Sequence, residues 1–134
     1  IIYIIFMAKN TIKVYFDGVC SHCSKEINYY KEIAQNGLFE WIDVTANPKA
    51  MIEYNITQAE ALLFIHAIDH NNTVFVGSEA FALIWKNLPN WKFLGHIVSL
   101  PIIRILAKHL YIQFAKRRFK RYRHCQLASK TLID

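Results

Sequence analysis

Two cysteines three residues apart, Cys20 and Cys23, have the clearest chemical potential in this chain. A close Cys-x-x-Cys pair supports either thiol–disulfide exchange or metal binding. A thiol attacks as its thiolate, and the free N–H groups and positive dipole end of a helix N-terminus stabilise that anion. With a helix beginning at this pair, Cys20 is the expected nucleophile and Cys23, one turn later, the thiol that resolves a mixed disulfide.

Asp17 and His22 flank the pair and are the other candidate catalytic residues. An imidazole close to the Cys20 sulfur stabilises the thiolate and makes the disulfide more oxidising. Replacing His22 by Pro should then lower the reduction potential, unless His22 is simply a solvated helix residue. Asp17 either accepts the Cys23 proton during resolution or orders the turn through backbone N–H groups, and the second role is favoured. Gly18 is expected to supply a backbone conformation closed to other residues.

The hydrophobic pattern places the cysteine pair where a strand meets a helix. Residues 12–16 are rich in strand-forming side chains and stop at Asp17-Gly18. Residues 20–36 carry apolar side chains at helical spacing, and residues 38–45 alternate like a second strand. This β-α-β opening predicts a parallel crossover.

The remaining chain predicts further short elements and a helical tail. The order as a whole predicts an α/β fold with a thioredoxin-like, mixed four-stranded sheet, flanking helices and a C-terminal helical extension. We assign residues 7–90 to the core and residues 91–134 to the extension, packed on the same single domain. Helices are expected from Pro48 to about Tyr54, from the capping box Thr57–Glu60, from a Ser78 cap to about 87, over 91–99 and over 102–124. Strands are expected over 62–68 and 73–76, and the two should pair as an antiparallel hairpin.

The stretch from Val14 to Cys23 resembles the signature of the DCC family of thiol-disulfide oxidoreductases, named for its Asp-x-x-Cys-x-x-Cys pattern. Asp17, Cys20 and Cys23 match that pattern. The resemblance implies a thioredoxin-like fold and a redox-active Cys20–Cys23 pair. It extends over nearly all of residues 11–125, with further matches at Gly77, Ala80, Phe81, Trp85, Leu100, Pro101, Tyr111 and residues 115–119.

We expect a protein or small-thiol substrate, with no bound cofactor and no metal. The reduction potential should be less reducing than that of a thioredoxin, because His22 lies between the cysteines. Thioredoxins carry a cis-Pro before the third strand that shapes their substrate groove. Residues 59–63 hold no Pro, so that docking mode does not carry over.

A zinc site is the first alternative. Cys20, Cys23, His124 and Cys125 are suitable ligand types for tetrahedral zinc. However, the adjacent His124 and Cys125 would have to converge on one ion, which makes this the less favoured interpretation. Cys125 is otherwise an incidental thiol, or a third thiol that exchanges with the pair.

The second alternative is a binding module, because the C-terminal part of the chain carries most of the positive charge. Residues 1–79 hold five Lys and Arg against nine Asp and Glu, whereas residues 80–134 hold eleven against one. The favoured interpretation packs an apolar helix face on the domain while cations cover its outside. The cationic end, Lys116–Arg123, could instead contact an anionic membrane surface, or nucleic acid, for which no recognised motif is present. The expected apolar face comprises Ile105, Leu106, His109, Ile112, Ala115 and Phe119.

The compartment is indicated only indirectly. Residues 1–8 are apolar but lack a preceding basic residue and a clear cleavage pattern, so a secretory signal is weakly supported, and we expect translation to start at Met7. The longest apolar region, residues 93–114, includes Pro101, Arg104 and Lys108 and makes a poor spanning helix. Three cysteines do not form a secreted disulfide framework. We therefore expect a cytoplasmic protein, with a peripheral position at a membrane as the alternative.

Overall fold

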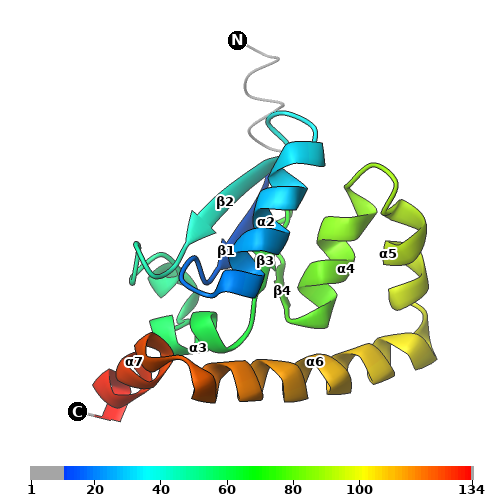
Figure 1. Ribbon diagram of the computed structural model, residues 1–134. Coiled ribbons are helices and arrows are strands. Elements are labelled where there is room, and N and C mark those ends of the chain that lie inside the picture. Colours follow the sequence, from blue (N-terminus) through cyan, green and yellow to red (C-terminus); the bar gives the residue numbers. More distant parts are fainter. Residues whose placement is uncertain (1–10, 134) are drawn as a thin grey trace.

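The protein, described by a computed structural model over residues 11–133, is built on a four-stranded sheet with the order β2-β1-β3-β4 (Figure 1). Strand β1 (Ile12–Phe16) pairs parallel with β2 (Phe39–Asp43) and antiparallel with β3 (His66–Ile68). Strand β4 (Val74–Val76) pairs antiparallel with β3. The predicted mixed, thioredoxin-like sheet and its hairpin are thus confirmed. The expectations for residues 1–8, including a start at Met7, lie outside the described residues.

Helices cover both faces of this sheet. Side chains alternate along a strand, so neighbouring residues of β1 enter two different cores. On one face, Val14 packs with Ile27 of α2 (Ser21–Ile33) and Ile84 of α4 (Ser78–Lys86). On the other face, Tyr15 packs with Leu62 of α3 (Gln58–Leu63).

Three helices follow α4 and wrap the end of the domain (Figure 1). Helix α5 (Lys92–Val98) packs on α4 at Gly95, where an added Cβ would lie 2.7 Å from the Lys86 backbone nitrogen. Helix α6 (Pro101–Arg121) begins with its proline at the first helical position and runs past α4 and α3. Helix α7 (Arg123–Ile133) packs against α3. These three helices thus contact α3 and α4.

Three of the shorter predicted elements are placed differently. The segment after Pro48 forms turns and a single 3-10 turn, η1 (Ile52–Tyr54), instead of a helix. Residues 62 and 63 end α3, so the third strand begins only at His66. Gly77, with a φ of 66°, precedes α4 as its cap, and the buried Ser78 hydroxyl has no partner among the described residues.

The long helix predicted over 102–124 is broken at Tyr122. This residue has extended dihedral angles (φ −100°, ψ 131°), and α7 starts immediately after it. Gln126 donates a hydrogen bond of 2.8 Å to the carbonyl of Phe119, which satisfies one acceptor freed at the end of α6. The break allows α7 to fold back on the sheet domain.

The packed face of α6 also differs from the prediction. Ala115 and Arg118 are buried, and Tyr111 packs on the core beside α4. Ile105 and Leu106, which were expected to face the domain, are 54% and 58% exposed. The buried and the exposed side chains of α6 therefore differ in where they lie on the helix, and not in how hydrophobic they are.

Candidate redox site

The site lies at the junction between β1 and α2. Asp17 follows the last residue of β1 and is only 3% exposed. One of its carboxylate oxygens accepts hydrogen bonds from the backbone N–H groups of Val19 and Cys20, at 3.0 and 3.2 Å. The carboxylate therefore holds the turn that delivers Cys20 to the start of the helix.

A second carboxylate fixes the same turn from β2. Asp43 accepts a hydrogen bond of 3.0 Å from the Gly18 N–H, and Thr45 also donates to it. Although burial opposes this, these hydrogen bonds lower the pKa of Asp43. An added Cβ on Gly18 would lie 1.9 Å from an Asp43 carboxylate oxygen. Gly18 is required for this close approach; the expectation of an unusual backbone conformation is wrong, since its φ is not positive.

Cys20 is the N-cap of α2. Its sulfur accepts a hydrogen bond from the backbone N–H of Cys23, at 3.5 Å. Its carbonyl accepts the first helical bond from Ser24, at 2.9 Å. The Cys20 sulfur thus occupies the position where a helix offers free N–H groups to an anion, as the sequence predicted.

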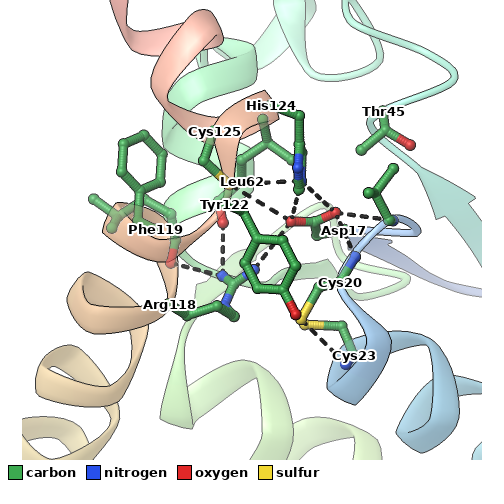
Figure 2. A network of polar contacts seen from close by, with 12 residues as sticks. Asp17, Cys20, Cys23, Thr45, Leu62, Arg118, Phe119, Tyr122, His124 and Cys125 are labelled. Carbon is green, nitrogen blue, oxygen red and sulfur yellow. Dashed lines mark hydrogen bonds and ion pairs between the residues drawn. The ribbon is translucent and has the colours of Figure 1, made fainter.

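Arg118 reaches this junction from α6 and is 8% exposed (Figure 2). One guanidinium nitrogen lies 3.1 Å from the Asp17 carboxylate, and the other donates to the carbonyls of Leu62 and Leu63, at 2.6 and 3.1 Å. Its planar fork thereby links the cysteine turn to the end of α3. The prediction that Arg118 belongs to a solvated cationic end of the helix is wrong.

His124 and Cys125 approach the same carboxylate from α7 (Figure 2). The His124 Nε2 atom lies 2.8 Å from Asp17, and the Cys125 sulfur lies 3.7 Å from it and 3.6 Å from His124. The adjacent His124 and Cys125 thus do converge on one point, contrary to the sequence-based objection. They meet Asp17 there, in a group that does not include Cys20 or Cys23, so the predicted four-ligand zinc set is not assembled.

Arg118 affects whether the Asp17, His124 and Cys125 cluster could bind a metal ion. A metal ligated by Asp17, His124 and Cys125 would lie beside a buried guanidinium that already neutralises the carboxylate. Two positive charges at such short range repel strongly in a buried site. The charge arrangement therefore favours a hydrogen-bonded cluster over a metal centre.

The two cysteines of the motif differ in their surroundings. Cys20 is fully buried, whereas Cys23 is partly exposed and lines a cavity of about 40 Å³ together with the exposed His22. That volume suits about one water molecule, so a substrate does not fit without movement. At the start of α2, the Ser21 hydroxyl lies 3.5 Å from the hydroxyl of Tyr122. The junction of α6 and α7 therefore contacts the first turn of the cysteine helix.

The electrostatic surroundings distinguish the thiols. Burial raises the pKa of Cys23, and the positive charge of Arg118 acts in the opposite direction. Burial, together with the negative charge of Asp17, raises the pKa of Cys125 to about 12. Burial alone would lower the pKa of Arg118, but the neighbouring thiols, Tyr111 and Asp17 raise it. Arg118 thus remains a fixed positive charge beside two sulfur atoms that resist ionisation.

Sequence reasoning missed two contributions of α6. Arg118 was counted among surface cations, because a run of Lys and Arg gives no sign of which member turns inward. Tyr111 was matched only as part of a resemblance, yet its hydroxyl accepts a hydrogen bond of 2.9 Å from the Ile65 N–H. The described residues contain no cis peptide bond, and this tyrosine contacts the backbone just before the third strand.

A mixed four-stranded sheet with a Cys-x-x-Cys pair at the end of its first strand defines a thioredoxin-like domain of the thiol–disulfide class. Over residues 14–124 the chain matches the family of DCC1-like thiol-disulfide oxidoreductases, and it belongs to that family. No curated protein and no solved structure matches it at a significant level.

Proposed function

We propose that the protein carries out dithiol–disulfide exchange through Cys20 and Cys23. The observation that carries this proposal is the capping geometry, in which the Cys20 sulfur accepts the Cys23 N–H at the start of α2. The start of α2 presents the Cys23 N–H and the positive end of the helix dipole to this sulfur, and the Arg118 charge lies near it. Cys23 stays protonated until it attacks the mixed disulfide, because burial raises its pKa.

The exchange takes place in two steps that balance. The Cys20 thiolate attacks one sulfur of a substrate disulfide, forms a mixed disulfide and releases the first substrate thiolate. Cys23 then loses its proton to that thiolate, directly or through water, and attacks the Cys20 sulfur. The Cys20–Cys23 disulfide forms, the second substrate thiolate leaves and two electrons have passed to the substrate. Two molecules of a small thiol of the glutathione class then reduce the Cys20–Cys23 disulfide to the dithiol and leave as their own disulfide.

Asp17 acts in this scheme as a positioning residue. Its two oxygens already receive donors from the Cys20 turn, Arg118, His124 and Cys125. A carboxylate offers about four acceptor sites, so little capacity remains for the Cys23 proton. His22 faces the cavity beside Cys23 and is proposed to tune the potential of the pair.

Substrate access requires the C-terminal junction to move. Cys20 is fully buried, and Tyr122 meets the neighbouring Ser21. A segment that joins two helices and has extended dihedrals is a natural hinge. We propose that this junction opens to admit a small thiol or a cysteine on an exposed protein segment.

The proposal is tested by trapping the mixed disulfide. The Cys23→Ser variant, incubated with glutathione disulfide, should retain one glutathione on Cys20, as read by peptide mass spectrometry. The Cys20→Ser variant should retain far less, and Cys125→Ser should behave as the wild type. Addition of a reductant should release the adduct.

Two results would overturn the assignment of roles. A stable adduct on Cys23 in Cys20→Ser, with none on Cys20 in Cys23→Ser, would make Cys23 the nucleophile. No adduct on either variant, with about one zinc bound per chain, would replace exchange by a metal-stabilised binding module.

A further inference from the structure

Large apolar side chains are exposed along α5 and the first half of α6. Phe93 of α5 is 78% exposed, and Ile102 and Leu110 of α6 are 75% and 72% exposed. Soluble surfaces carry scattered apolar residues, but a contiguous group of this size marks an interaction site. The corner between α5 and α6 lies at the end of the molecule away from α7 (Figure 1).

Helical spacing gathers these side chains on one outer face. Ile102, Leu106, Leu110 and Phe114 follow one another at intervals of four, so they lie along one side of α6. All four are more than half exposed. Twelve residues of helix give this apolar row a length of about 18 Å.

The same outer face becomes cationic toward the end of α6. Arg117 comes one turn after Phe114, and Arg121 one turn after that; both are exposed. Arg104 and Lys108 are also exposed, but they lie on the side of α6 toward α4, where each lines a hollow together with Glu79. The chain has no Asp or Glu between Glu79 and Asp134, so no acidic residue of α5 or α6 offsets the charge of Arg117 and Arg121.

We propose that this outer face of α5 and α6 docks on an anionic phospholipid surface, with α6 lying in the plane of the interface. The apolar row would enter the boundary between headgroups and acyl chains, while Arg117 and Arg121 contact lipid phosphates. A partner protein surface of ordinary composition offers both signs of charge, whereas this face carries only positive charge. Uniform positive charge beside exposed apolar side chains is complementary to an anionic bilayer.

A sharp bend separates α5 from α6. Within the described part of the chain, no single helix is both long and apolar enough to cross a bilayer. Helices α5 and α6 meet that criterion only when joined, and a bend of 91° separates them. Docking through the outer face leaves the inner face of α6, with Ala115 and Arg118, packed on the domain.

The proposal is tested by flotation of the purified full chain with phosphatidylcholine vesicles, with and without phosphatidylglycerol, at physiological ionic strength. The wild type should bind the anionic vesicles and bind the neutral ones much less. The Ile102→Glu/Leu106→Glu variant should bind at least tenfold more weakly. Arg117→Glu/Arg121→Glu should lose about fivefold for each cation removed, and more for the charges added.

Matched controls place equal changes elsewhere on the surface. Ile52→Glu/Val76→Glu alters two other exposed apolar residues, and Lys25→Glu/Lys49→Glu alters two other exposed cations. Both should bind like the wild type. Wild-type failure to bind, or equal loss in controls and test variants, would overturn the proposal. So would a dimer in solution that Ile102→Glu/Leu106→Glu dissociates, because a second copy would then cover this face.

Discussion

The two ends of α6 have environments opposite to those that their compositions suggest, because the cationic end holds a buried arginine and the apolar end is exposed. Near its C-terminal end, Arg118 is buried and pairs with Asp17, 101 residues earlier in the chain. Near its N-terminal end, Ile102 and Leu106 are exposed although they are apolar. One end therefore completes the polar network around Asp17, and the other presents an exposed apolar surface.

This difference shows that the neighbour across the interface decides burial. Arg118 is buried because Asp17 and two carbonyl groups at the end of α3 satisfy its donors. Ile102 meets no comparable surface, since it lies on the outer side of α6, away from the helices on which α6 packs. Substitution of Arg118 should therefore lower the free energy of unfolding strongly, whereas substitution of Ile102 or Leu106 should hardly change it.

The largest effect is expected at Arg118. Arg118→Met leaves the Asp17 carboxylate buried without its cation, and should lower the free energy of unfolding by about 3–5 kcal/mol. Arg104→Met, on the exposed part of the same helix, should change it by less than about 0.5 kcal/mol. Urea denaturation followed by circular dichroism measures both. Similar values for the two variants would mean that the Arg118–Asp17 pair does not hold the site together.

The next effect depends on pH and concerns Cys125. Its pKa is about 12 in the folded protein against 9.0 in the unfolded chain. Between these values the folded state binds more protons than the unfolded state, so stability should fall as the pH rises from about 9 toward 12. Cys125→Ala should show a shallower decline. Denaturation curves at pH 8, 9 and 10 for both proteins give the slopes, and parallel slopes would contradict the burial assigned to this thiol.

A smaller loss is expected at Tyr111. Tyr111→Phe keeps the ring in place but removes the acceptor of the Ile65 N–H, and should lower the free energy of unfolding by about 1–3 kcal/mol. Phe114→Leu, one turn away and 51% exposed, is the matched control and should have little effect. Equal stabilities of Tyr111→Phe and the wild type would show that water replaces the tyrosine hydroxyl.

The smallest effect on stability is expected at the exposed end of α6. Ile102→Ser and Leu106→Ser remove apolar surface that is already in contact with water, so the free energy of unfolding should change by less than about 0.5 kcal/mol. The same denaturation assay applies. A loss of 2 kcal/mol or more would mean that this face packs against another part of the protein.

The cysteine turn and the sheet were predictable because their signals are local. Strand periodicity ends at Asp17-Gly18, and the cysteine pair follows at once, so the junction could be placed from about ten neighbouring residues. The hairpin of β3 and β4 was found in the same way, from the turn residues Asp69–Asn72.

The remainder of the site could not be predicted in this way. Arg118 and His124 reach Asp17 only because α6 crosses the domain and the chain breaks at Tyr122. Tyr122 is neither Pro nor Gly, so nothing local signals the break. The role of Gly18 was assigned wrongly for a related reason, since the carboxylate that approaches it belongs to Asp43 on another strand.

The reduction potential of the Cys20–Cys23 pair tests the central claim most directly. We would titrate the purified protein in glutathione buffers, trap the thiols for mass spectrometry, and measure zinc in the same sample. A reversible two-electron couple less reducing than about −270 mV is predicted, with a lower value for His22→Pro. Absence of a Cys20–Cys23 disulfide across the titration, with about one zinc per chain, would contradict the redox account.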